Sequence, residues 1–212
     1  MKVNNYPLKT PSTGDKLFGS DSNGDQKQFD MTAVSSNVFQ YEIGEYAEDE
    51  GGVIFHRYLD GDTQNYLVVG LTDLSTSKNW SNVTSTLIGS TSQSSWDGLS
   101  NSNAIIGQSG FTDGAAKLCL DSIDNNQTDW YLASFSELSL MMQNIFNINE
   151  TLSGNSSYGL ISGAVQILRN VYWSSTEVDS TNALVVDFRF NSYASNSKNA
   201  SNYVRAVRKF SI

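Results

Sequence analysis

The side chains that most often carry enzyme chemistry are scarce in this sequence, with one histidine, His56, and one cysteine, Cys119. Acyl transfer needs a nucleophile, a base and a group that orients the base, and no serine lies in a glycine-flanked nucleophile turn. One cysteine and one histidine can form neither an intrachain disulfide nor a zinc site. We therefore predict no enzyme activity, no metal site and no cofactor. Paired carboxylates stay open, because any two of the acidic residues can meet in a fold.

A polar stretch at 191–202 is the stronger candidate for function. It is rich in Asn and Ser and lies between two apolar, partly alternating runs at 183–190 and 203–210, which predict strands. We therefore predict a loop displayed by two strands, in which Tyr193 supplies contact area and the polar side chains supply adaptable hydrogen bonds. An inert solvated turn is the alternative. The predicted ligand-binding residues are Arg189, Asn191, Tyr193, Ser195, Asn196 and Lys198.

Other strands and helices are needed to hold such a loop. Apolar runs at 53–59 and 66–71 predict a β-hairpin, and His56 inside the first run is predicted to be structural or on the surface. A helix is expected at 113–123, with Cys119 on its buried face. A second helix should follow Ser134, because Glu137 completes a capping box. The long polar stretch 75–112 is predicted to be irregular. The residues predicted to lie in the core are Trp130, Leu132, Trp173, Val204 and Val207.

Residues 1–40 differ from the rest and contain both prolines of the chain. Asn23-Gly24 predicts a two-residue type I′ turn and hence a short hairpin. A calcium loop at 21–25 is the less favoured alternative, because the EF-hand order is broken. So small a hairpin cannot bury its own apolar side chains, and it should dock on a partner. The predicted anchor residues are Leu17, Phe18, Phe29 and Met31.

Charge limits the classes of partner. The net charge of −9 argues against nucleic-acid binding, which requires a positive face to neutralise phosphates. No stretch is long and apolar enough to predict membrane insertion, and the N-terminus lacks the apolar run of a signal peptide. The acidic residues at 41–50 predict a solvated linker, with a cation site as the alternative. We thus expect a segment at 1–40, a linker at 41–50 and a folded domain at 51–212, made in a reducing cytosol.

Four ordered blocks of the sequence resemble a C-type-lectin-like family found in gut bacteria and their phages. The family is related in fold to formylglycine-generating enzyme and to the variable proteins of diversity-generating retroelements. The resemblance covers roughly residues 51–210 and departs from the family at Ala133, where proline is usual. The blocks are DWYLAS at 129–134, EL at 137–138, YWSSTE at 172–177 and YVRAVR at 203–208.

The resemblance implies an α+β fold, a C-type-lectin-like domain with two helices and antiparallel sheets behind a short N-terminal hairpin anchor. It also implies a virion structural protein, a head or tail fibre or decoration protein of a crAss-like phage, that displays a face for adhesion to host-surface or mucus glycans or proteins. Residues 1–40, which resemble N-terminal segments of phage fibres, would bind other virion proteins. A homo-oligomer, by family a trimer, is expected. The alternatives are an architectural capsid decoration protein without a host ligand, and a diversified bacterial adhesin.

Overall fold

The computed structural model describes residues 16–20, 23–30, 39–167 and 169–212 of the chain. The chain divides into two compact units, Met1–Gln40 and Tyr41–Ile212. In the first unit, β1 (Lys16–Ser20) pairs antiparallel with β2 (Gln26–Asp30).

The turn between these two strands differs from the predicted one. The last pair of the ladder is Ser20 with Gln26, which is too widely separated in sequence for a two-residue turn. Gly24 has a φ of +86°, whereas Asn23 is not among the described residues with positive φ, as a type I′ turn would require. Of the predicted anchor residues, Leu17 and Phe18 lie on β1 and Phe29 lies on β2, with Leu17 opposite Phe29. Met31 lies outside the described residues.

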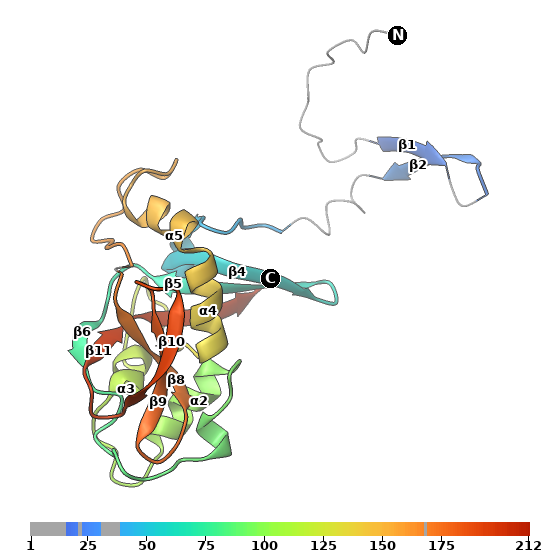
Figure 1. Ribbon diagram of the computed structural model, residues 1–212. Helices are drawn as coiled ribbons and strands as arrows, with labels where there is room; N and C mark the ends of the chain where they lie inside the picture. Colours follow the sequence, from blue (N-terminus) through green and yellow to red (C-terminus); the bar gives the residue numbers. More distant parts are fainter. Residues whose placement is uncertain (1–15, 21–22, 31–38, 168) are drawn as a thin grey trace. The chain divides into compact units, whose positions relative to one another are not determined.

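The second unit contains two five-stranded sheets (Figure 1). All neighbours in the first sheet are antiparallel, and the predicted hairpin at 53–59 and 66–71 is confirmed as β4 and β5. Gly61, in the tight turn between them, has a φ of +59°, which glycine adopts without a steric penalty. The strand order of this sheet is β3 (Tyr46–Ala47), β4 (Gly52–Asp60), β5 (Thr63–Gly70), β12 (Ala206–Ser211) and β7 (Tyr131–Leu132).

The second sheet is mixed, because β11 runs parallel to β8 while the other pairs are antiparallel. Its edge strand β10 occupies half of the polar stretch 191–202, so the prediction of a loop throughout that stretch is wrong. An edge strand near solvent on both faces needs no apolar period, which is why residue pattern alone did not reveal it. The strand order is β10 (Ser192–Ser197), β9 (Asn182–Asp187), β8 (Val171–Glu177), β11 (Asn202–Val204) and β6 (Ser75–Lys78).

The described residues also form four α-helices, which makes the unit a mixed α+β fold with two more helices than predicted. Ser134 caps α4 and Glu137 completes the predicted capping box, which is confirmed. The helix α2 was missed, because it lies in the polar stretch 75–112 and buries Asn101 and Ser102 along with Ile105. The helices are α2 (Gly98–Ile106), α3 (Ala115–Leu120), α4 (Phe135–Gln143) and α5 (Ile145–Leu152).

The main core lies between the first sheet, the helices α4 and α5, and the strands β8 and β9 (Figure 1). Both helices pack on β4. All five residues predicted to be core are at most 1% exposed, and Cys119 is fully buried, as predicted. Burial also raises the pKa of the Cys119 thiol, so this side chain is an unreactive apolar group.

The acidic stretch 41–50 is part of the second unit rather than a solvated connection. Within it, β3 pairs with β4, and a 3₁₀ turn (Glu48–Glu50) ends at Gly51 in the left-handed conformation. The carboxylate of Glu50 accepts a hydrogen bond from the buried guanidinium of Arg208. Strand pairing and this ion pair together fix a segment whose composition alone predicts a linker. No helix in the described ranges is long and apolar enough to cross a membrane.

Candidate functional site

A pocket of about 530 Å³ opens on one face of the first sheet. His56, Leu67 and Lys209 lie opposite one another on β4, β5 and β12 and form a row across its floor. One wall comes from α4 and the other from the segment before and at the start of α2. We call this site the Trp96 pocket; its lining residues are His56, Tyr58, Leu67, Trp96, Asp97, Leu99, Tyr131, Glu137, Leu140 and Lys209.

The most exposed aromatic side chain in the pocket, Trp96, stands on a tightly held backbone. Its indole is 70% exposed. Two residues before Trp96, the carbonyl of Ser94 accepts hydrogen bonds from Asn101 Nδ2 (2.6 Å) and Thr176 Oγ1 (2.9 Å). The Oγ of Ser94 accepts from the backbone N–H of Trp96 (3.2 Å). The loop is therefore positioned before any ligand arrives, while a large apolar side chain remains in water.

A deeply buried polar group of the pocket is the carboxyl of Glu137, which is only 5% exposed. Its Oε1 accepts from the hydroxyl of Tyr131 and its Oε2 from the backbone N–H of Ser134, both at 2.7 Å. Burial raises the pKa of Glu137, although the hydrogen bonds from Tyr131 and Ser134 oppose that rise. Burial, followed by the nearby Glu137 charge, also raises the pKa of Tyr131, which therefore remains a hydrogen-bond donor.

The close packing of the two walls depends on Gly98, the first residue of α2. A Cβ at this position would overlap Glu137 Oε2 and would lie 2.7 Å from Ser134 N and 2.8 Å from Leu132 O. Any larger residue would push the loop that carries Trp96 away from α4. A glycine here is thus required by the close approach of α2 to the carboxyl.

The remaining polar groups give the pocket both signs of charge. The Nζ of Lys209 lies 5.2 Å from the centre of the Tyr58 ring, and His56 stacks on the same tyrosine at 5.9 Å. Burial lowers the pKa of His56, so its imidazole is neutral at pH 7. Asp97 caps α2 by accepting from Ser100 N (2.9 Å) and Ser100 Oγ (2.7 Å).

The pocket answers the question of paired carboxylates that the sequence left open, because Asp97 and Glu137 line the same cavity. Both oxygens of Glu137 already accept hydrogen bonds within the fold, and the side chain is almost fully enclosed. This carboxyl is therefore placed to orient its neighbours rather than to transfer a proton to a ligand. Within the described part of the chain, no three His, Cys, Asp or Glu side chains are grouped so as to hold a metal ion.

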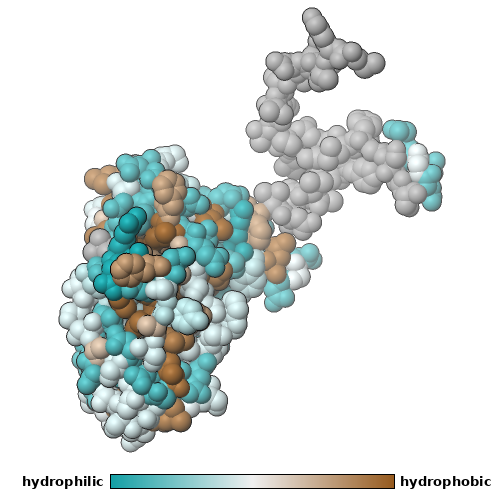
Figure 2. Space-filling model, in the orientation of Figure 1, coloured by the Kyte–Doolittle hydropathy of each residue, from teal (hydrophilic) through white to brown (hydrophobic). Residues whose placement is uncertain are grey.

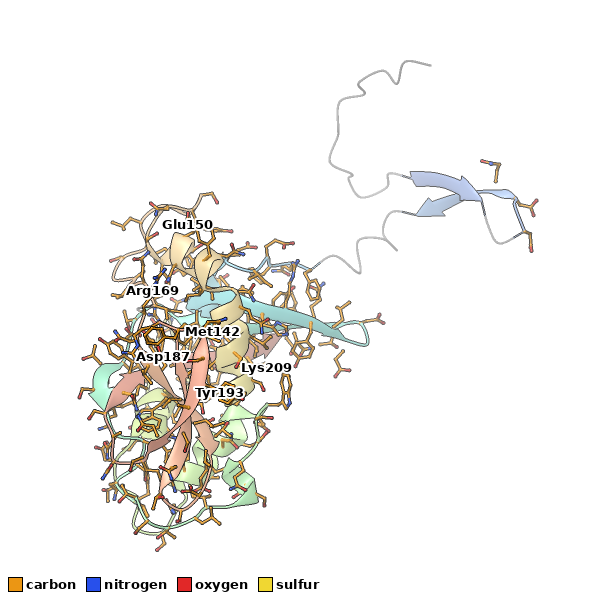
Figure 3. The ribbon with its side chains drawn as sticks, viewed as in Figure 1. Met142, Glu150, Arg169, Asp187, Tyr193 and Lys209 are labelled. Atoms are coloured by element: carbon orange, nitrogen blue, oxygen red, sulfur yellow. The ribbon has the colours of Figure 1, made fainter. Side chains whose placement is uncertain are left out.

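Four of the predicted ligand-binding residues, Arg189, Asn191, Tyr193 and Ser195, are exposed on β10 and the turn before it. Arg189 forms a salt bridge with Asp187 (2.6 Å), and the ring of Tyr193 packs edge-on against Phe135 of α4 at 4.9 Å. Asn196, the fifth, is half-buried. Figure 3 labels Tyr193, on β10, and Lys209, which belongs to the pocket floor.

The sixth, Lys198, cannot contact a ligand, and its assignment is wrong. Its side chain is fully buried, and its ammonium donates to Glu177 Oε1 (2.7 Å), Thr86 O (3.1 Å) and Ser180 O (3.0 Å). The ammonium also lies 5.0 Å from the centre of the Trp80 ring. The reason is electrostatic: Glu177 ends the buried strand β8 and requires a cation, and Lys198 is the cation that reaches it.

Sequence reasoning missed the residues that make up the pocket. Trp96 was visible as an isolated aromatic in a polar stretch, and that was the one available signal. Tyr58, Tyr131 and Lys209 come from three strands that meet only in the sheet, so no spacing along the chain could reveal them. The sequence matches no protein-family model and no curated protein, so the pocket and the predicted surface on β10 are interpreted from their own geometry.

Proposed function

We propose that the chain is a structural protein of a bacteriophage particle, a head or tail fibre or decoration protein, that carries an adhesive domain. The adhesive domain is the second unit, and we propose for it a C-type-lectin-like fold. Support comes from the sequence blocks that resemble that family: YWSSTE is β8, YVRAVR spans β11 and β12, and DWYLAS runs through β7 to the cap of α4. All three blocks thus lie on elements that surround the main core.

The observation that carries the adhesive role is the Trp96 pocket. An open pocket with a largely exposed tryptophan adds little to folding stability, because the indole remains in water. Concave, aromatic-lined pockets of roughly 300–1,000 Å³ are the usual form of ligand sites. A ligand that covers the indole would gain the stabilisation that the fold leaves unused.

A second contact surface would lie on β10. Its candidate residues are the five from the predicted loop that reach solvent fully or in part, namely Arg189, Asn191, Tyr193, Ser195 and Asn196. Their side chains are polar or aromatic and offer adaptable hydrogen bonds around one anchor, Tyr193. This surface would supply additional contacts to a host glycan or protein, while the pocket would hold the main determinant.

Residues 1–40 would attach the domain to other virion proteins, through the apolar residues Leu17, Phe18, Phe29 and Met31. Many copies on one particle, as homo-oligomers that the family suggests are trimers, would convert modest site affinities into firm attachment. The net charge of −9 fits a partner other than nucleic acid. Synthesis in the host cytoplasm followed by assembly into the virion completes this proposal, by analogy with crAss-like phages.

The test uses intact phage particles that carry either the natural chain or the Trp96→Ala variant. We expect natural particles to bind host cells or mucin and variant particles to bind several-fold more weakly, with equal amounts of the protein in both. A deletion of residues 1–40 should abolish incorporation of the chain into particles. Particles that lack this protein and still bind normally would contradict the adhesive role.

A purely architectural role, as a capsid decoration protein without a host ligand, is the second candidate. It is favoured by strongly exposed apolar side chains outside the pocket, such as Phe146 (72%), Leu160 (85%) and Phe190 (74%), which could cover neighbouring subunits. Figure 2 shows apolar residues scattered on the face in view. A glycan array with the purified protein distinguishes the two roles, because a purely architectural protein would bind no host glycan. Antibody against residues 191–202 shows whether that surface faces outward on intact particles. A diversified bacterial adhesin is the remaining alternative.

A further inference from the structure

We infer that the Trp96 pocket binds a neutral saccharide, with one face of a sugar ring stacked on the indole of Trp96. The inference names the ligand class of the adhesive site and so rests on the proposed function. It is carried by three features of the pocket: the exposed indole, the mixture of charges around it, and the fixed positions of the groups that form it.

The exposed indole is the first feature. Trp96 presents 70% of its surface to solvent at the rim, with Leu99 beside it on the same wall. A sugar ring has a face of C–H groups and an edge of hydroxyls, so it can cover an aromatic face while its edge stays polar. Amphipathic aromatic side chains suit such a ligand, because they supply a large contact area with little loss of conformational entropy.

The mixture of charges decides between ligand classes. Lys209 would repel a cationic ligand, and no salt bridge to another described residue neutralises its ammonium. Asp97 and Glu137 would repel an anion, and the net charge of −9 would add to that repulsion at long range. A neutral ligand with many hydroxyls avoids both penalties, because each hydroxyl can donate to a carboxylate and accept from an ammonium or an imidazole.

The fixed positions of the polar groups favour a rigid polyhydroxylated ligand. The Tyr131 hydroxyl is held on Glu137, and Asp97 is held by Ser100, so neither carboxyl rotates freely. His56 is held against Tyr58. A site whose side chains are already ordered loses little entropy on binding, which matters most for small ligands that make few contacts. The volume of about 530 Å³ accommodates one or two sugar rings.

We expect binding through this pocket to be independent of calcium, because its two carboxylates, Asp97 and Glu137, are already held by hydrogen bonds within the fold. The experiment is a titration of the full-length protein with four neutral disaccharides: maltose, cellobiose, lactose and N,N′-diacetylchitobiose. Ligand-observed NMR and tryptophan fluorescence report binding. Choline and glucuronate serve as cationic and anionic probes.

We expect at least one neutral disaccharide to bind with a Kd of roughly 0.1–10 mM, the range for a small site with few contacts. Trp96→Ala should weaken it about tenfold or more, as loss of an aromatic anchor does. Trp96→Phe should retain part of the affinity. The matched control is Phe190→Ala, which removes an aromatic side chain of similar exposure (74%) outside the pocket and should leave Kd within about twofold. Chelation of divalent cations should have no effect.

Three results would overturn the inference: no neutral disaccharide binds, binding survives Trp96→Ala unchanged, or only choline or only glucuronate binds. Different results would refute the adhesive function. Particles whose attachment requires Trp96 but is not inhibited by any of the disaccharides would retain the proposed function and refute the saccharide. Disaccharide binding that requires Trp96, in particles whose attachment does not, would retain the saccharide site and refute the adhesive role.

Discussion

Two glutamates of this protein are buried to the same extent but in opposite settings. Glu177, 3% exposed, ends β8 and forms a salt bridge with the fully buried Lys198 at 2.7 Å. Glu137, 5% exposed, lies at the wall of the Trp96 pocket and accepts hydrogen bonds from the neutral donors Tyr131 and Ser134. Among the described residues, no lysine or arginine forms a salt bridge with Glu137.

The first setting is a sealed structural link. Besides Lys198, the Glu177 carboxylate accepts from the backbone N–H groups of Ile88 (2.9 Å) and Gly89 (2.8 Å), and Lys198 donates to Thr86 O. The pair therefore fastens the segment 86–89 to the second sheet. Charge and hydrogen-bonding capacity are both satisfied inside the fold.

The second setting leaves a carboxyl without a countercharge beside an open cavity. Such an arrangement contributes less to stability than a paired carboxylate, and perturbed groups in clefts are typical of functional sites. The difference between the two glutamates indicates which region of this molecule is a candidate binding site. The Glu177–Lys198 ion pair supports the structure, whereas the region around Glu137, which forms no ion pair with another described residue, is available to a ligand.

The largest effect should come from breaking the sealed pair. Lys198→Met keeps an apolar stem in place but leaves Glu177 buried and unpaired, so we expect a loss of about 3–5 kcal/mol in the free energy of unfolding. Urea denaturation of the full chain measures it. The matched control is Lys117→Met, which breaks the exposed salt bridge with Asp121 and should cost about 0–1 kcal/mol. Equal losses in the two variants would show that the buried pair is not the main constraint.

The next effect should come from forcing the two walls of the pocket apart. Gly98→Ala places a methyl group against Glu137 Oε2 and Ser134 N, and overpacking of this kind costs about 1–3 kcal/mol. Gly70→Ala is the control, because its Cβ would meet its nearest neighbour, Ala206 O, at 3.5 Å, an ordinary contact. Thermal denaturation compares them. If the two variants melt alike, α2 does not need its close approach to α4.

These two sites also show what the sequence could and could not reveal. The capping box of Ser134 and Glu137 was predictable, because its partners are three residues apart and the pattern is local. The same Glu137 also holds Tyr131 and faces α2, which depends on tertiary packing. Lys198 lies in a polar stretch, so composition placed it on the surface, whereas a long-range charge pair placed it in the interior.

The fold, like the two sites, was predictable only in part. The β4–β5 hairpin and the five predicted core residues were recognised, since alternation and apolar runs report burial directly. The helix α2 was not, because it buries Asn101 and Ser102 through hydrogen bonds rather than an apolar stripe. The pocket was not, because its floor combines residues from β4, β5, β12 and β7 that are far apart in sequence.

A smaller effect should appear as pH dependence at Glu137. Its pKa in the folded protein is raised above its ordinary value of 4.5, so its contribution to stability is full below 4.5 and is lost as pH rises through the folded pKa. Glu137→Gln, which keeps the shape and an acceptor for Ser134, should remove that loss. We expect the variant to gain stability relative to the natural protein as the pH rises from acidic to neutral.

The pKa of His56 is shifted in the opposite direction, so His56 affects stability on the acidic side. Its pKa is lowered below 6.5, so its contribution is present above 6.5 and is lost as pH falls through the folded pKa. A Glu137→Gln profile that runs parallel to that of the natural protein would mean that Glu137 keeps its ordinary pKa.

The smallest effect on stability should come from the residue to which we assign the largest effect on binding. Trp96→Ala removes an indole that is 70% exposed, so we expect the free energy of unfolding to change by no more than about 0.5 kcal/mol. Trp173→Ala is the counterpart in the structural region: its indole is 1% exposed and donates to Lys78 O at 2.7 Å, and its loss should cost about 3–5 kcal/mol. A large loss from Trp96→Ala would instead mean that the indole supports the fold, and the contrast between the two regions would disappear. A stable Trp96→Ala protein that no longer binds sugar would show that stability and recognition are carried by different tryptophans.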